Sequence, residues 1–147
     1  MMPPQSNEKR PLAALLVPDL LELLEEAPGS VRAQTEEMHP ADLADVAEAM
    51  PEDAVRSFLA ALGKDRAAEV LEYLDDDLRT QFLEELTPRE AASIVAEMTP
   101  DERADALEEL DEETADDILS ELEPAEKAET ERLLRSLDPI AMERFTD

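Results

Sequence analysis

A twelve-residue repeat constrains the fold of this chain more than any other feature. From Met38 to Glu121 the sequence divides, without insertion or deletion, into seven units of twelve, and an eighth begins at Leu122. Position 1 is methionine or leucine in all eight units, and positions 9 and 10 are alanine, valine, isoleucine, leucine or phenylalanine in every complete unit. These positions predict one apolar face for each unit.

A single long helix cannot use this repeat. Within a unit, positions 6, 9, 10 and 13 have the i, i+3, i+4, i+7 spacing of an amphipathic helix. Twelve residues at about 100° each bring the apolar stripe back about 120° out of phase, so a continuous helix would spread that stripe around its surface. We therefore expect the helix to end and restart in every unit.

Prolines and capping residues predict where each helix starts. Proline occupies position 3 in four units and position 2 in one, and both places are tolerated at a helix start but costly in an interior. Thr87 and Thr99 each precede such a proline, and Glu90 and Glu102 follow at the spacing of a capping box. Each unit is thus expected to form a helix of about nine or ten residues, roughly 15 Å long.

Helices this short need neighbours to be stable. Stacking them buries the apolar faces, so the expected fold class is all-α, an α-solenoid or superhelix of about ten short helices in which two units make one helical hairpin. Two further helices are expected at 19–27 and 30–38, and a last one from Pro139. Residues 1–18, with four prolines, are expected to be a disordered leader, and 19–147 the folded domain.

The charge of the chain excludes nucleic acid as a general partner. Forty Asp and Glu against thirteen Lys and Arg give a formal net charge of −27, which repels a phosphate backbone. The same excess attracts cations or basic proteins, or simply keeps the protein soluble. The longest apolar run, Leu12 to Val17, is far shorter than the roughly 20 residues that span a bilayer. With no cysteine and no export signal, a cytoplasmic location is expected.

Enzymatic chemistry has few candidate residues. His39 is the single histidine and directly precedes a proline, which favours a capping or connecting role over a general base or metal ligand. The two glycines cannot form a glycine-rich phosphate loop. The loop that begins at Asp75 lacks the glycine and glutamate of a calcium-binding EF-hand. We therefore expect that this chain is not an enzyme.

The carboxylates are the remaining candidates. Asp101 and Asp105 are i and i+4 on one expected helix, where like charges repel by a few tenths of a kcal/mol unless a cation lies between them. Carboxylate-rich sites without nitrogen ligands suit hard cations such as Mg²⁺ or Ca²⁺. The spacing is common in acidic helices, so a solvated surface and a metal site both remain open at this point.

Four stretches of the repeat carry a family resemblance. They are MHPADLADVAEAM, DRAAEVLEYLDDD, LTPREAASIVAEM and TPDERADALEEL. Over about residues 20–140 the chain resembles the cytosolic N-terminal domain of the MgtE-type magnesium channels and transporters. The resemblance implies a right-handed superhelix that is followed, in the family, by a pair of CBS domains and a membrane pore formed as a homodimer. The sequence of this chain contains neither the CBS pair nor transmembrane helices.

The resemblance also implies a role in Mg²⁺ sensing. Carried over by position, the metal-contacting acids of the family fall on Glu69, Asp101 and Asp105. In the family, Mg²⁺ ions between this domain and the CBS domains hold the channel closed, so the implied partner is a CBS pair in the same or a companion chain. The alternative is a non-enzymatic helical scaffold, like the related short-helix domain of the flagellar motor-switch protein FliG, in which the acids serve solubility.

Overall fold

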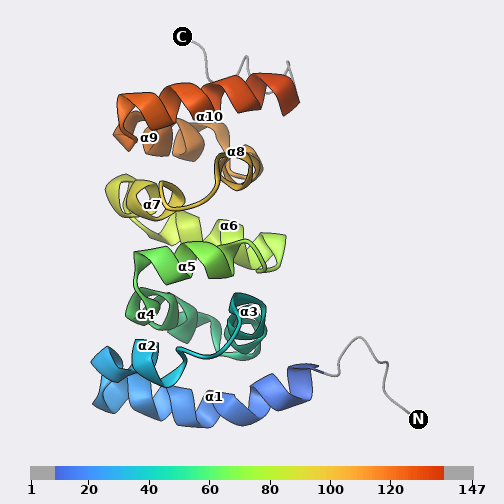
Figure 1. Cartoon of the computed structure of the whole chain (residues 1–147), viewed down its shortest axis with the longest axis vertical. Helices are drawn as coiled ribbons and strands as arrows, with labels where there is room; N and C mark the ends of the chain where they lie inside the picture. The colour runs from blue at the N-terminus through green and yellow to red at the C-terminus, as the bar shows by residue number, and fades with distance from the viewer. Residues whose placement is uncertain (1–8, 138–147) are drawn as a thin grey trace, which may run out of the picture. The chain divides into compact units, whose positions relative to one another are not determined.

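Helices restart every twelve residues, as the repeat predicts. The computed structural model in Figure 1 describes residues 9–137, which form helices and connecting turns and no strand. In the repeat region the first residue of each helix falls at unit position 3. These helices are α3 (Pro40–Ala49), α4 (Glu52–Leu62), α5 (Lys64–Leu71), α6 (Asp76–Glu85), α7 (Pro88–Val95), α8 (Pro100–Glu109), α9 (Glu112–Glu121) and the longer α10 (Pro124–Leu137). The all-α fold is confirmed.

Side-chain caps fix several of these starts. Thr87 accepts from the Glu90 backbone N–H at 3.1 Å, and Glu90 accepts from the Thr87 N–H at 3.0 Å, which completes the predicted capping box. Thr99 accepts from the Glu102 N–H at 3.4 Å, but the return bond from Glu102 is absent from the described contacts. The predicted capping box at α8 is therefore wrong in its second half.

His39 caps α3, as predicted from its place before a proline. Its Nδ1 accepts a hydrogen bond from the Ala41 N–H at 2.9 Å, and its ring meets the Tyr73 ring edge-on, with centroids 5.5 Å apart. The imidazole thereby satisfies one of the N–H groups that a helix start leaves without an intrahelical partner.

The chain divides into two compact units, and the first comprises residues 1–75. Ahead of the repeat it contains α1 (Lys9–Glu26), the short 3-10 helix η2 (Pro28–Ser30) and α2 (Val31–Gln34). Within this unit α1 packs on α3, and α3 and α4 both pack on α5. The core is built from fully buried repeat positions, among them Leu43, Val46, Phe58, Leu59 and Leu71.

The first helix begins earlier than the sequence predicts. Residues 9–18 of the expected disordered leader are helical, and residues 1–8 lie outside the described part of the chain. Ala13, Val17 and Leu20 are buried at i, i+4 and i+7, so an apolar stripe crosses the expected boundary. The burial of this stripe offsets the cost of Pro18 inside α1. By contrast, α2 ends at Gln34, short of the expected Met38.

The second unit comprises residues 76–147 and is described as far as Leu137, so the helix expected from Pro139 lies outside it. Here α7 packs on α9, and α8 packs on both α6 and α10. Within this unit each helix contacts the helix two places along the chain, which is the packing expected when successive helix pairs stack on one another. Val95, Leu107, Ile118 and Leu134 are buried between these helices.

Across residues 9–137, none of the helices is both long enough and apolar enough to cross a bilayer.

Replacing Gly63, which joins α4 to α5, with alanine is expected to lower the free energy of unfolding by about 1–3 kcal/mol. Gly63 has φ of 91°, a conformation that residues with a Cβ rarely adopt, and a Cβ there would lie 2.5 Å from Arg32 Nη1. Urea denaturation measures the change. Gly29→Ala is the matched control, since open space surrounds Gly29. An equal loss in both variants would mean that the positive φ of Gly63 and its closeness to Arg32 are not the cause.

Candidate metal-binding surface

Asp101 and Asp105 lie on the exposed side of α8. The helix starts at the Thr99 cap, and its opposite side buries Ala104, Ala106 and Leu107. Neither aspartate side chain makes a hydrogen bond or ion pair with the described residues. One helical turn separates them, which places their Cβ atoms about 5–6 Å apart. They are therefore two open carboxylates on one helix face.

The opposite side of α8 is anchored by Arg103, which is only 4% exposed. Its guanidinium donates to the backbone carbonyls of Val95 at 3.0 Å, Ala96 at 3.4 Å and Met98 at 3.1 Å, and to Thr130 Oγ1 at 3.0 Å. One side chain thus ties α8 to the end of α7 and to α10. Because the anchor lies between them in sequence, it fixes the direction in which Asp101 and Asp105 point.

Arg103 is a buried charge with no carboxylate partner among the described residues. Its partners are instead carbonyls at the C-terminal end of α7, where the helix dipole is negative and the last carbonyls lack intrahelical donors. The burial of Arg103 was not predicted from the sequence. A signal was available, because Arg103 and Arg79 occupy unit position 6, an apolar-stripe position that is leucine, valine or alanine in the other complete units.

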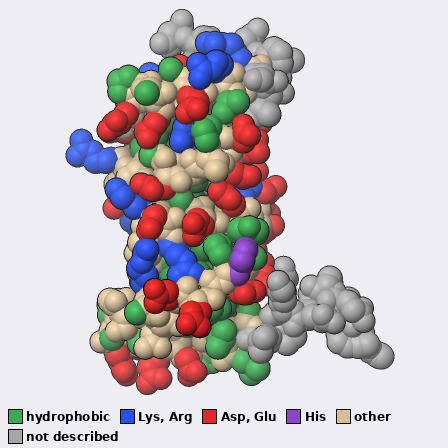
Figure 2. All heavy atoms as spheres, viewed as in Figure 1, with side chains coloured by type: hydrophobic (Ala, Val, Ile, Leu, Met, Phe, Trp, Pro, Cys, Tyr) green, Lys and Arg blue, Asp and Glu red, His purple; other side chains and the backbone are tan. Residues whose placement is uncertain are grey.

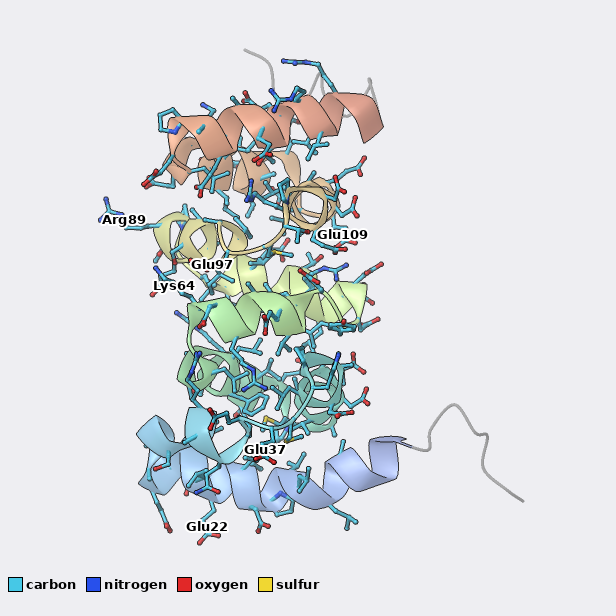
Figure 3. The ribbon with its side chains drawn as sticks, in the orientation of Figure 1. Glu22, Glu37, Lys64, Arg89, Glu97 and Glu109 are labelled. Atoms are coloured by element: carbon cyan, nitrogen blue, oxygen red, sulfur yellow. The ribbon has the colours of Figure 1, made fainter. Side chains whose placement is uncertain are left out.

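Arg79 neutralises a different acid of α8. From α6 it donates to both carboxylate oxygens of Glu109, at 2.9 and 2.8 Å, and it also pairs with Asp76. Burial raises the pKa of the Glu109 carboxyl, and the bond from Arg79 opposes that rise. Figure 3 labels Glu109 on α8, and Arg89 projecting into solvent from α7. Among the acids of α8, Glu109 therefore has a cationic partner that Asp101 and Asp105 lack.

Glu69, the third candidate, belongs to the first unit and lies exposed on α5. Its neighbourhood already holds a cation, Arg32, whose guanidinium pairs with Asp65 at 2.8 Å and whose pKa is raised chiefly by Asp65 and to a smaller extent by Glu36 and Glu69. On the buried side of α5, Arg66 donates to the Thr35 carbonyl at 3.2 Å and to the Met38 carbonyl, an anchor similar to that of Arg103.

The ion pair with Arg32 gives Asp65 a testable acid response. It lowers the pKa of the Asp65 carboxyl to about 2 from an ordinary value near 3.8, so the unfolded chain binds the proton more readily. The stabilisation is therefore complete above about pH 4 and is lost as the pH falls from about 4 to 2. Since the Asp65 side chain is 60% exposed, solvent screening keeps it below about 1 kcal/mol.

Thermal melts between about pH 5 and 2 cover this window. Over that range the melting temperature of Asp65→Asn is expected to fall less than that of the parent chain. The matched control is Asp53→Asn, at the same repeat position of α4, where no contact with a described basic residue is found. If the two variants lose stability in parallel with acid, the Arg32 pair is not the cause.

The three candidate acids are divided between the two units, with Glu69 in the first and Asp101 and Asp105 in the second. Among residues 9–137, no group of three or more Asp, Glu or His side chains is close enough to hold a metal ion. The structure brings Asp101 and Asp105 together on α8, and Glu69 is described in the separate first unit. Figure 2 shows acidic side chains scattered over the visible face, with no single dense cluster. The chain therefore offers a two-carboxylate donor set at Asp101 and Asp105, which fits part of the coordination shell of Mg²⁺.

A family model described as the MgtE intracellular N domain matches residues 38–135. The chain belongs to this family. The MgtE N domain match begins at Met38, the first residue of the repeat, and ends within α10. It covers Glu69, Asp101 and Asp105, so all three candidates lie on the part of the chain that is shared with the family.

The fold is similar to that of a solved structure described as the crystal structure of the soluble part of a magnesium transporter. The TM-score is 0.72 at 24% sequence identity, over 85% of this chain and 49% of that one. This similarity shows that the two chains share a fold, and this chain spans about half the length of the solved chain. No curated protein matches the chain.

Proposed function

We propose that this chain is an Mg²⁺-sensing regulatory domain of an MgtE-type magnesium transporter, located on the cytosolic side of the membrane. The observation that carries the proposal is the Asp101–Asp105 pair, two exposed carboxylates one turn apart with no cationic partner among the described residues. Oxygen ligands of this kind are those that Mg²⁺ prefers. Membership of the MgtE N domain family supports Mg²⁺ as the ion.

The mechanism is electrostatic. Mg²⁺ prefers six oxygen ligands in octahedral geometry and usually keeps several waters, so two aspartates can hold it only together with water and a second surface. We take that second surface to be acidic and to belong to a CBS domain pair in the same or a companion chain. Without the ion, two acidic surfaces repel. With the ion between them they are bridged, and the population of the closed arrangement rises.

We propose that Glu69 makes a separate contact with the same partner from the first unit. Its exposure on α5 leaves it accessible, while the nearby Arg32 competes for its charge. A site shared between two domains binds the ion weakly to either domain alone, so the isolated chain is expected to respond at millimolar Mg²⁺. The homodimer is proposed to form only in the full-length transporter.

Paramagnetic Mn²⁺ in place of Mg²⁺ tests where the ion binds. In ¹H–¹⁵N spectra of the full chain, small additions of Mn²⁺ are expected to broaden amides around Asp101 and Asp105 first, and excess Mg²⁺ is expected to reverse the broadening. Amides around Glu113 and Asp117 serve as the internal control, because these acids occupy the same repeat positions, 4 and 8, of α9. Equal broadening at both pairs would mean that the ion follows overall charge and not this site.

A further inference from the structure

An apolar groove lies between α1 and α2 within the first unit. It has a volume of about 430 Å³, which falls in the roughly 300–1,000 Å³ range of binding clefts. Leu16, Leu20 and Leu23 line it from α1 at i, i+4 and i+7 spacing, and Met38 lines it from the segment after α2. The three leucines span about 10 Å along the helix. Leu20, which is only 7% exposed, also belongs to the buried stripe of Ala13 and Val17, whereas Leu16 is 38% exposed.

The rim of the groove is acidic. Asp19, Glu22 and Glu26 line its α1 side at i, i+3 and i+7, all three are exposed, and the lining contains no lysine or arginine among the described residues. Figure 3 shows Glu22 projecting outward from α1. Because these acids and the leucines follow the same helix, an apolar strip about 10 Å long runs beside a parallel row of negative charge.

We propose that this groove binds a basic amphipathic helix. A partner helix with leucine or methionine at i, i+4 and i+7 would place these side chains against the three leucines and Met38. Lysine or arginine flanking that stripe would then meet the three rim carboxylates. The complementary charge selects a basic helix over an acidic or neutral one, and the flexible Met38 side chain accommodates variation in the inserted residues.

The site is independent of the proposed Mg²⁺ surface. Its residues lie on α1, at the end of α2 and in the segment after it, whereas Asp101 and Asp105 lie on α8 in the second unit. The two functions can therefore be tested separately, and measuring the peptide in EDTA removes any contribution from divalent cations.

The test uses fluorescence anisotropy with the full chain and a labelled synthetic peptide. The peptide carries leucine at i, i+4, i+7 and i+11, with lysine on both flanks of the stripe. A second peptide of identical composition has its leucines dispersed around the helix. We expect the first peptide to bind at least about tenfold more tightly, because only its apolar side chains can enter the groove together.

Two adjacent leucines of α1 supply the matched variants. Leu16 lines the groove and is 38% exposed, whereas Leu15 is 72% exposed and does not line it. Leu16→Lys is expected to weaken binding about tenfold or more, and Leu15→Lys by less than about twofold, although both change the net charge equally. Circular dichroism melts check that each variant folds.

A second pair of variants keeps the test decisive if Leu16→Lys does not fold. Glu22→Gln with Glu26→Gln removes two rim charges, and Glu112→Gln with Asp116→Asn removes two exposed charges at the same i, i+4 spacing from α9. Only the rim pair is expected to weaken binding and reduce its salt dependence. Absence of binding, equal binding of the dispersed peptide, or equal effects of the matched variants would overturn the proposal.

Discussion

Replacing Arg103 with methionine is expected to lower the free energy of unfolding by about 3 kcal/mol, which is a large part of the 5–15 kcal/mol typical of a domain. Methionine approximates the length of the side chain but donates no hydrogen bond. The carbonyls of Val95, Ala96 and Met98 and the Thr130 hydroxyl would each lose the bond that Arg103 donates to them. Buried acceptors left without a donor carry the full cost of desolvation.

Urea denaturation measures this change, and two further variants define its origin. Arg103→Lys keeps the charge but cannot reproduce the guanidinium fork, so an intermediate loss is expected. Arg89→Met removes an arginine that projects into solvent from α7, and a change within about 0.5 kcal/mol is expected. If Arg103→Met and Arg89→Met were equally stable, the buried bonds would not be what anchors α8.

Most of the repeat architecture can be predicted from the sequence because each helix start is marked locally. Proline tolerates the first turn of a helix and disfavours its interior, and the apolar positions recur at helical spacing within each unit. The twelve-residue spacing of the apolar positions, with a proline marking the start in five units, predicts the helix starts from Pro40 to Pro124. These signals fail ahead of the repeat, where Pro18 suggests a break but the stripe of Ala13, Val17 and Leu20 continues through it.

The buried arginines were harder to predict. Position 6 belongs to the apolar stripe, so Arg79 and Arg103 at that position were a signal for two buried charges that was missed. Their partners lie 30 and 27 residues away, at Glu109 and Thr130, and also at carbonyls that the end of α7 leaves without donors. A repeat pattern shows that such a group is buried, but only the packed helices show what it bonds to.

The candidate metal surface could likewise be predicted from the sequence only in part. The exposure of Asp101 and Asp105 on one face follows from helical periodicity. That Asp65 is engaged by Arg32 does not follow, because the ion pair joins residues 33 positions apart. The ligands that would complete a six-coordinate Mg²⁺ site lie beyond any pattern in this sequence, since we propose that a partner domain supplies them.

Asp101 and Asp105 are expected to give the chain a specific response to Mg²⁺. Asp101→Asn with Asp105→Asn is expected to abolish the part of the Mg²⁺-dependent stabilisation that comes from a specific site. For a single site this part is about 1.4 kcal/mol when the ion is at ten times its dissociation constant. In EDTA the double variant loses a like-charge repulsion of a few tenths of a kcal/mol, so the parent chain gains its advantage only as Mg²⁺ is added.

Any divalent cation will also relieve the net charge of −27, so the control must carry the same charge change. Glu113→Gln with Asp117→Asn provides it. These acids occupy repeat positions 4 and 8 of α9, exposed and one turn apart, and Glu113 lies in the first helical turn just as Asp101 does in α8. The two double variants therefore share net charge, spacing and position relative to the helix dipole.

The decisive measurement is the melting temperature of the parent chain and both double variants against MgCl₂ and against CaCl₂, at constant ionic strength. We expect Mg²⁺ to raise the melting temperature of the parent chain and of the Glu113/Asp117 variant equally, and that of the Asp101/Asp105 variant by less. Equal Mg²⁺ responses in all three proteins would contradict this expectation, because the ion would then act on overall charge and not through Asp101 and Asp105.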